Sequence, residues 1–599
     1  MIKVTPGSFT SFRMTKFSTP GSFAPLRMTK FVGLMLIMGL CSLSSANAMG
    51  NSATTSSTNP NPWDHVNTSD PAKDLEVWQE AKDIDPGIQE FYIAEHLRRL
   101  GRTQEAIDAY YRVLTEHTRT VIWAANGAFY WYPSKEALSR IRKLCALHPE
   151  LQTTLEGAWL DIAISPDHKP EHDHVRLWRG KFKKSTSAPP NLAELEIVQK
   201  RGGDYVKAVQ FSNGHWQLRV KDEPFVVKGV SYHPTAVGES AHAQNIRPWM
   251  NLDDNRNGLN DLMFESWVDR NKNNVQDEDE PIVGDATLLQ NLGANTLRYY
   301  HTARNNGMYD PQEYNKELMR KLHAEYGIYF ILGDFVGAYT VGSGAAWNAG
   351  TDYRSKTQRE RMLKNVRLLV EDHKNEPYVL MWLLGNENQH HVSRTNASQY
   401  PKEFAEFLNE VAQMIHEIDP SRPVAVGNLA STGLREIALH APQIDIYGAN
   451  VYAGAYSMGS VVQEVKWLFD RPLLFTEWGN DVYFEGRGED EAAQAAYIRS
   501  NWEDMQLNFA GNRGEGNIIG GLLFEWMDEW WKSSKGDSWG DPNDHNTQAD
   551  FPFPFADGYA HEEWFGIVGQ GNGSDSPKQR ELRQAYFELQ ALWTQNSSK

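Results

Sequence analysis

The sequence predicts an α/β protein whose main part, residues 225–595, is an eight-stranded parallel (β/α)8 barrel. Short apolar runs alternate with helix-length segments, there are eight such runs, and each ends in polar or aromatic residues. Eight βα units imply a closed barrel, and the carboxyl ends of barrel strands carry the functional side chains. The runs are FVVKGVSYH, ANTLRYYH, IYFILGDF, YVLMWLLGNE, PVAVGN, IDIYGANVY, PLLFTEWG and GGLLFEWMDEWW.

A helical segment is expected ahead of the barrel, over residues 70–180. Its stretch YIAEHLRRLGRTQEAIDAYYRVL places small and packing residues as a single tetratricopeptide-like helical hairpin does. One repeat cannot bury its own face, so we expect a helical subdomain packed on its neighbour. The alternative is an array that binds a protein partner.

A β-hairpin is predicted between the helical segment and the barrel, over residues 200–224. Apolar and polar residues alternate there, and Asn213-Gly214 is a typical two-residue hairpin turn. The hairpin should lead the chain into the first barrel strand.

The first 48 residues resemble a signal peptide. Lys30 precedes an apolar run that is too short to span a bilayer, and the small-residue site Ala-Asn-Ala ends at Ala48. Lipid anchoring through Cys41 is the less favoured alternative, because the preceding Leu40 is poorly suited to it. Residues 49–69 are polar and turn-rich, as in a linker. We therefore expect an exported protein, periplasmic or secreted.

The composition limits the classes of partner. The chain has 59 Lys and Arg against 77 Asp and Glu, a formal charge of -18, whereas nucleic-acid binding needs clustered positive charge. Its 20 Trp and 24 Tyr favour carbohydrate, although core packing could also use them. We expect a glycan partner and no nucleic acid.

Two glutamates end predicted barrel strands. Glu387 closes the fourth run and Glu477 closes the seventh. Cleavage of a glycosidic bond with retention needs one carboxyl that protonates the leaving oxygen and a second that attacks the anomeric carbon, roughly 5–5.5 Å away. Strands four and seven of a barrel can aim two side chains across its mouth at such a separation.

Four motifs in this order resemble glycoside hydrolase clan A, the retaining (β/α)8-barrel glycosidases. GNE at the end of strand four and TEWG at the end of strand seven are similar to the acid/base and nucleophile motifs of that clan. KGVSYHP (228–234) and LGANTLRYYH (292–301) resemble the first two strands of family 2 barrels. The resemblance spans roughly residues 222–595 and is closest to the catalytic barrels of families 2 and 5.

The resemblance implies roles for the residues of the two glutamate motifs. Glu387 would be the general acid/base and Glu477 the nucleophile. Asn386 would bind the sugar 2-hydroxyl, and Arg298 would lie beneath Glu477 and pair with its charge.

Other positions would contact the substrate. Tyr452, after strand six, matches a tyrosine that bonds the nucleophile, and Trp526, after strand eight, matches the aromatic floor of the reacting sugar's subsite. His233 and His301 are expected as further substrate contacts.

The chain departs from family 2 ahead of the barrel, where β-sandwich domains are usual and this sequence has a helical segment and a hairpin. The sugar and the linkage therefore cannot be carried over. We expect an exported retaining β-glycoside hydrolase, with no organic cofactor. A transglycosylase using the same intermediate and a non-catalytic glycan-binding or scaffold protein are the alternatives.

An acidic insertion, residues 247–283, separates the first two strands and resembles two calcium loops. Alternating Asp and Asn side chains supply the oxygens that calcium prefers, so a structural calcium ion is expected. Two positions depart from the pattern: Phe264 replaces the last ligand of the first loop, and Asn274 takes a glycine position. A solvated acidic loop is the alternative. The expected ligands are Asp253, Asn255, Asn257 and Asp261 in the first loop, and Asp269, Asn271, Asn273, Asp277 and Glu280 in the second.

Overall fold

A computed structural model describes residues 71–594 of the chain with short gaps. The predicted signal peptide, residues 1–48, and the linker, residues 49–69, lie outside the described residues, and so does His301. In the described part of the chain, no helix combines the length and the apolar character that crossing a bilayer requires. The gaps are residues 83, 125–128, 166, 168, 185–187, 242–244, 252, 254–262, 301–307, 312–313, 455–457, 533–540, 554, 556 and 558.

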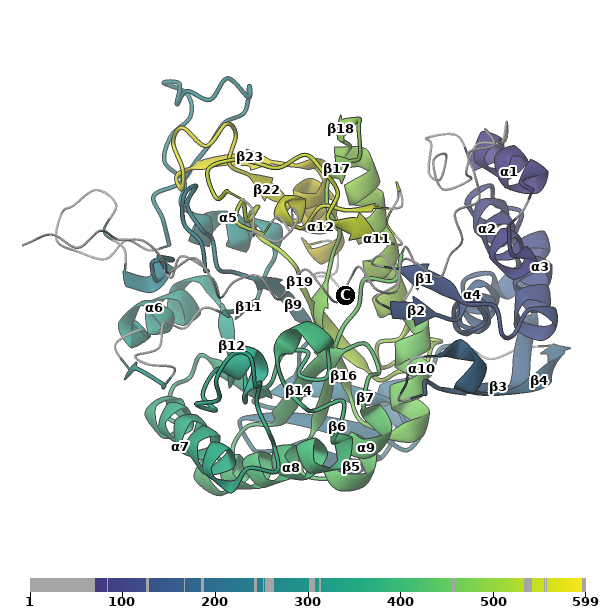
Figure 1. Cartoon of the computed structure of the whole chain (residues 1–599), viewed down its shortest axis with the longest axis horizontal. Helices are drawn as coiled ribbons and strands as arrows, with labels where there is room; N and C mark the ends of the chain where they lie inside the picture. Colours follow the sequence, from purple (N-terminus) through teal and green to yellow (C-terminus); the bar gives the residue numbers. More distant parts are fainter. Residues whose placement is uncertain are drawn as a thin grey trace, which may run out of the picture. The chain divides into compact units, whose positions relative to one another are not determined.

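The predicted barrel is confirmed (Figure 1). Eight strands, each overlapping one of the eight apolar runs, pair in parallel and close on themselves in the order β11-β12-β13-β14-β15-β16-β19-β9. Their polar endings therefore meet at one end of the barrel, as expected. The strands are β9 (Val227–Ser231), β11 (Thr296–Arg298), β12 (Tyr329–Asp334), β13 (Val379–Leu384), β14 (Val424–Leu429), β15 (Ile446–Asn450), β16 (Leu473–Trp478) and β19 (Ile518–Leu523).

Helices surround the strands because their apolar stripes need burial. In α8 (Pro401–Ile418), Phe404, Leu408, Val411 and Ile415 recur at helical spacing and are fully buried against the strands. The other outer helices are α5 (Asp285–Leu292), α6 (Lys316–Tyr326), α7 (Lys356–His373), α9 (Leu434–His440), α10 (Gly459–Leu468), α11 (Glu491–Leu507) and α12 (Gln584–Thr594).

The predicted hairpin forms, as the centre of a four-stranded antiparallel sheet. Its turn includes Gly214, which has a φ of 88° that suits glycine. Val206 and Leu218 of this sheet belong to the same buried cluster as barrel residues such as Met381 and Leu474, so the sheet closes the amino-terminal end of the barrel. The strands are β5 (Ile197–Gly202), β6 (Val206–Phe211), β7 (Trp216–Val220) and β8 (Glu223–Pro224).

The segment ahead of this sheet is helical only in its first part. The expected hairpin forms as α2 (Pro86–Arg99) and α3 (Thr103–Glu116), preceded by α1 (Pro71–Glu80) and followed by α4 (Pro133–Leu147). The prediction of helix up to residue 180 is wrong, because β3 (Thr153–Ala163) and β4 (His174–Lys184) form a long antiparallel ribbon. A short pair, β1 (Ile122–Ala124) and β2 (Phe129–Trp131), precedes α4.

The helical part packs on the barrel helices. The Lys143 ammonium lies 3.4 Å from the Asp504 carboxylate on α11, and Ser460 Oγ at the start of α10 donates to Glu136 of α4 at 2.7 Å. This agrees with a subdomain that buries its face against its neighbour. A protein partner of the segment stays a prediction.

Short paired strands lie in the insertion and in the segments that follow β16 and β19. β10 (Trp267–Val268) pairs with β23 (Gln579–Leu582), which also pairs with β22 (Val568–Gly569). The remaining pairs are β17 (Tyr483–Phe484) with β18 (Gly488–Glu489), and β20 (Phe551–Pro552) with β21 (Tyr559–Ala560).

Candidate active site

The two predicted glutamates lie at the carboxyl ends of β13 and β16. Glu477 is the penultimate residue of β16, and its Cα is in register with Asn450 at the end of β15. Glu387 follows β13 after a sharp turn in which Gly385 has a φ of 80° and Glu387 itself a φ of 53°. A positive φ is unfavourable for a glutamate and is typical of residues held in place at functional sites.

Glu477 accepts hydrogen bonds from three side chains. The Tyr300 hydroxyl donates to Oε1 at 2.6 Å, and the Tyr452 hydroxyl donates to Oε2 at 2.9 Å. Arg298 Nη1 also lies 3.3 Å from Oε1. Glu477 is 7% exposed. Three donors around a buried carboxylate stabilise its negative charge, as an attacking group requires.

Glu387 has a different environment. Asn450 Nδ2 donates to its Oε1 at 2.9 Å. Burial and the negative charge of Glu477 raise the pKa of Glu387 to about 8. A carboxyl that stays protonated near neutral pH can donate a proton.

A hydrogen-bond network connects the two glutamates. Arg298 Nη2 donates to Asn386 Oδ1 at 2.9 Å, and Asn450 Nδ2 lies 3.2 Å from the same oxygen. Thr476 Oγ1 holds Asn450 by donating to its Oδ1 at 2.7 Å. Arg298 and Asn450 both donate to the amide oxygen of Asn386, so the Nδ2 group of Asn386 is turned to other acceptors. The structure therefore brings five predicted residues together: Glu387, Glu477, Arg298, Asn386 and Tyr452.

Sequence reasoning missed two members of this site, Tyr300 and Asn450. Tyr300 follows Arg298 by two residues, and the period of a strand places such residues on one face. Asn450 is a fully buried amide at the end of an otherwise apolar strand, which is unusual unless it is hydrogen-bonded. Both features are visible in the sequence.

The prediction for Trp526 is wrong. Its indole is 1% exposed in the main core, and its Nε1 donates to Asp285 at 3.1 Å. Phe524, two residues earlier, faces the site instead: its ring centroid lies 6.3 Å from Tyr300 and 6.4 Å from Tyr452. Phe524 is therefore the aromatic residue that packs beside the two tyrosines that donate to Glu477.

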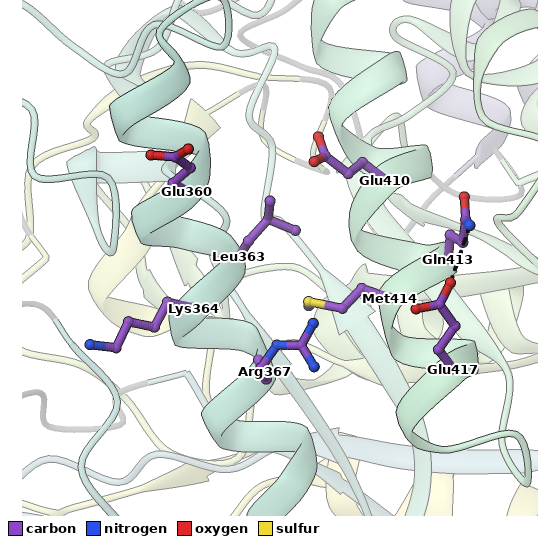
Figure 2. A pocket seen from close by; sticks show the side chains of 8 residues that line it. All are labelled: Glu360, Leu363, Lys364, Arg367, Glu410, Gln413, Met414 and Glu417. Atoms are coloured by element: carbon purple, nitrogen blue, oxygen red, sulfur yellow. Dashed lines mark hydrogen bonds between the residues drawn. The ribbon is translucent and has the colours of Figure 1, made fainter. Parts of the chain in front are cut away.

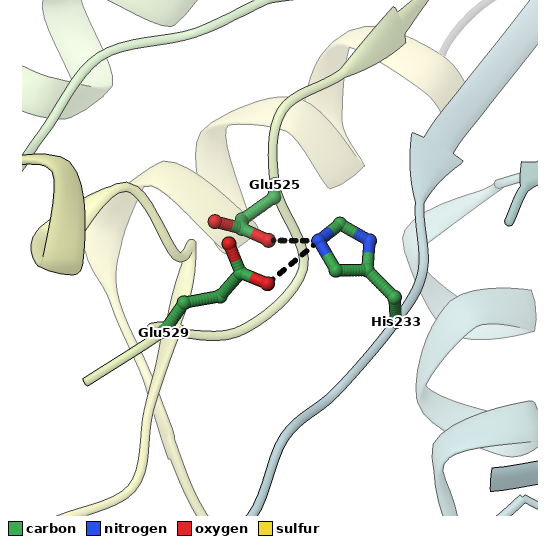
Figure 3. Close-up of side chains that lie close together, drawn as sticks. All are labelled: His233, Glu525 and Glu529. Atoms are coloured by element: carbon green, nitrogen blue, oxygen red, sulfur yellow. Dashed lines mark ion pairs between the residues drawn. The ribbon is translucent and has the colours of Figure 1, made fainter. Parts of the chain in front are cut away.

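His233 lies beside the site, and one of its ring nitrogens faces two buried glutamates (Figure 3). Its Nε2 is 3.0 Å from Glu525 and 2.9 Å from Glu529, and its ring packs edge-on at 5.1 Å from Tyr300. Burial alone would lower the pKa of His233, but Glu529 and Glu525 raise it to about 9. The two glutamates therefore favour the protonated form of His233, whose ring packs against Tyr300.

These three side chains also have the composition of a metal site. Their ligand atoms lie within 4.8 Å of one another. However, the Lys532 ammonium lies 2.7 Å from Glu529 and 4.1 Å from the Phe524 ring centroid. Two cationic groups already balance the two carboxylates, so we interpret the group as an internal ion network.

Two further groups face the glutamate pair. Burial, followed by the charges of Glu387 and Glu477, raises the pKa of Tyr339. Burial also raises the pKa of Glu562 to about 7, with Lys532 opposing the rise. Both belong to loops at the carboxyl end of the barrel.

The second predicted calcium loop is a compact turn closed by its own side chains. Asp269 accepts from the backbone of Asn273 at 3.2 Å and of Asn274 at 2.8 Å. Asn271 and Asn273 donate to Asp277 at 2.8 and 2.9 Å, and Glu280 accepts from the Arg270 backbone at 2.7 Å.

Asn274 has the expected positive φ, at 61°. In the first loop Asp253 is described, whereas Asn255, Asn257 and Asp261 lie outside the described residues. Calcium binding itself stays a prediction.

A groove on the outer surface lies between α7 and α8 (Figure 2). Its lining comes from helix faces and contains none of the site residues. It is therefore separate from the candidate active site. The lining side chains are Glu360, Leu363, Lys364, Arg367, Glu410, Gln413, Met414 and Glu417.

Residues 269–509 match the family model of the glycosyl hydrolases family 2 TIM barrel domain. The matched stretch contains both glutamates, Arg298 and Tyr452. The predicted resemblance to clan A is confirmed. The similarity to a family 2 barrel supports the expectation of a glycosidase.

Curated relatives extend the comparison. A beta-glucuronidase of Streptococcus agalactiae is 26% identical over 220 residues, which are 33% of this chain and 32% of that protein. A putative beta-glucuronidase of Formosa agariphila is 25% identical over 359 residues, 56% of this chain and 35% of that protein. The chain thus spans about a third of the length of the curated relatives it matches.

Among solved structures, Bacteroides uniformis beta-glucuronidase 2, covalently bound to cyclophellitol-6-carboxylate aziridine, is 14% identical with a TM-score of 0.39. That match covers 72% of this chain and 46% of the other.

Proposed function

We propose that the protein is an exported retaining β-glycoside hydrolase that acts on a β-linked oligo- or polysaccharide through two glutamates. The observation that carries the proposal is the asymmetry of the pair. Glu477 holds three hydrogen-bond donors, whereas the pKa of Glu387 is raised to about 8. A carboxyl with a raised pKa fits an acid, and a carboxylate that accepts from three donors fits a nucleophile.

In the first step, a carboxylate oxygen of Glu477 would form a bond to the anomeric carbon. The bond from that carbon to the leaving oxygen would break, and Glu387 would give its proton to this oxygen. Asn386 Nδ2, which neither Arg298 nor Asn450 occupies, would donate to the 2-hydroxyl of the reacting sugar. Phe524 would pack against the apolar face of that sugar.

In the second step, Glu387 has lost its proton and acts as a base. It would remove a proton from water while the water oxygen attacks the anomeric carbon, and the bond to Glu477 would break. The two inversions give net retention. The Tyr300 and Tyr452 hydroxyls would stabilise the departing carboxylate.

The sugar is left open between uronides and neutral glycosides. The curated relatives are named as beta-glucuronidases, so a β-glucuronide is the first substrate to test. In this chain the cations beside the site, His233 and Lys532, already pair with Glu525 and Glu529. Neutral β-glycosides therefore belong in the same panel.

Export is part of the proposal and rests on the amino-terminal sequence. Lys30, the apolar run after it and the small residues before Ala48 fit a cleaved signal peptide. The mature protein would be periplasmic or secreted. Edman sequencing of the processed protein should begin at Met49.

The test is a product profile for the wild type and the Glu477→Gln variant. Both would be incubated with aryl β-glycosides, including the β-glucuronide, and with β-glucans, mannans, galactans and xylans. We expect shortened products from the wild type alone, with β configuration in the first product seen by NMR. Products longer than the substrate would indicate transglycosylation, and equal activity of the variant would contradict the mechanism.

A further inference from the structure

The β3–β4 ribbon exposes tryptophans on the face that is turned away from α2, α3 and α4. Its inner face carries the buried Leu155, Ala158, Leu160 and Ile162. Trp159 and Trp178 are directly opposite each other in register, so they share the other face. Trp178 is 39% exposed, which is uncommon for so large an apolar side chain.

A third tryptophan extends this face onto the barrel. Trp467 of α10 is 60% exposed, and its ring centroid lies 5.2 Å from that of Trp159. Arg435 of α9 forms an ion pair with Asp161 of the ribbon. The rings therefore line a continuous surface where the ribbon meets α9 and α10. We call Trp159, Trp178, Trp467 and Arg176 the ribbon surface.

Positive charge accompanies the rings. The guanidinium carbon of Arg176 lies 4.3 Å from the centroid of Trp178, a cation–π contact. β4, with the sequence HVRLWRGKFKK, contains five Lys or Arg and no Asp or Glu. This strand lies in a chain whose formal net charge is -18. Such a local excess of positive charge attracts an anionic ligand.

We propose that the ribbon surface binds an acidic polysaccharide, separately from the active site. Exposed indole rings cover the apolar faces of pyranose rings, and Arg and Lys pair with carboxylate groups. Charged side chains interrupt the rings, whereas a protein helix would need a continuous apolar groove. The choice of a glycan as the occupant rests on the proposed function. Tethering at this surface would raise the concentration of substrate near the barrel.

The test uses affinity electrophoresis to measure binding of the full-length Glu477→Gln variant to polygalacturonate and alginate. Neutral dextran is the comparison. We expect retardation by both acidic polymers, less of it at high salt, and none by dextran. Trp178→Ala and Trp467→Ala should each raise the apparent Kd about tenfold. Trp347→Ala is the matched control, because Trp347 is 45% exposed, lies 5.5 Å from Arg394 and is outside the ribbon surface.

Several results would overturn the proposal: no retardation by either acidic polymer, equal retardation by dextran, or a loss of binding in the Trp347→Ala control as large as that in Trp178→Ala and Trp467→Ala. Capture of a protein with no polysaccharide binding would also overturn it. Circular dichroism checks that the variants fold, and Arg176→Gln offers a milder change with the same expected direction. Hydrolysis of a small aryl β-glycoside by Trp178→Ala with an intact Glu477 should stay unchanged. Loss of polysaccharide binding and failure of the proposed hydrolysis are thus separate outcomes.

Discussion

The buried carboxylates of the barrel differ in how completely they are hydrogen-bonded, as a comparison of Asp285 with the pair Glu387 and Glu477 makes clear. Asp285, at the start of α5, is fully buried and accepts five hydrogen bonds. Two of these come from Arg580, at 2.9 Å each. The other three come from Tyr232, Ser266 and Trp526.

The two glutamates of the candidate active site are hydrogen-bonded unequally. Glu477 has three donors, whereas Asn450 is the donor to Glu387 among the described contacts. The burial of Glu387 next to another carboxylate is unfavourable for folding and useful for proton donation. The difference teaches that a fully satisfied buried charge holds the fold, whereas an incompletely satisfied one marks the chemistry.

The largest effect should follow from Glu387→Gln, because it removes the proton donor. We expect kcat/KM on substrates with poor leaving groups to fall roughly 10²–10⁴-fold. Aryl substrates with good leaving groups should form the covalent intermediate at nearly normal rates. Stopped-flow bursts measure this, and a uniform loss on all substrates would break the assignment of Glu387 as the acid.

Asp285→Ala should act on stability instead. It leaves the Arg580 guanidinium buried and unpaired, which costs about 3–5 kcal/mol. The urea midpoint should fall, whereas the folded variant should keep its kcat. A variant of normal stability with lost activity would reverse the comparison between the two sets of carboxylates.

Asn450→Ala sharpens the comparison through pH. Glu387 must be protonated to act, so activity of the wild type should fall as pH rises through about 8. The Asn450 hydrogen bond favours the charged form and lowers the pKa of Glu387. Its removal should move the alkaline limb of kcat/KM to higher pH while lowering the plateau. A limb that moves to lower pH would contradict this account.

The smallest expected effect is on thermal stability and concerns the loop 269–280, whose carboxylates should bind calcium. A ligand at 100 times its Kd stabilises a protein by about 2.7 kcal/mol. Calcium should therefore raise the thermal midpoint, and EDTA should lower it. Asp277→Asn should reduce that response and leave activity unchanged. An identical melt with calcium and with EDTA would show that the loop is only a solvated acidic turn.

Much of the barrel and of its centre could be predicted because its strands are short, apolar and end in polar groups. Glu387 and Glu477 follow from those endings, whereas Arg298, Asn386 and Tyr452 are implied by the resemblance to clan A. The aromatic residue beside Tyr300 and Tyr452 could not be predicted, because β19 ends at Leu523 and two aromatic residues follow closely. Which of Phe524 and Trp526 faces the site depends on the turn after the strand.

The ribbon was hidden for a different reason. Gly157 and Gly180 both have positive φ, at 69° and 66°, and interrupt the alternation of β3 and β4. The two strands keep their register across these glycines, but the buried positions of β3 change from Leu155 to Ala158, Leu160 and Ile162, which weakens the period of two. The helical pattern just before the ribbon also favoured continuing the helix.

The most direct test of the central claim is a covalent label on Glu477. The protein would be incubated with aryl 2-deoxy-2-fluoro-β-glycosides of several sugars, including the glucuronide, and its intact mass measured. The account predicts one added glycosyl group, located on Glu477 by peptide mapping and absent from Glu477→Gln. A label on another carboxylate, or labelling that survives in Glu477→Gln, would contradict it.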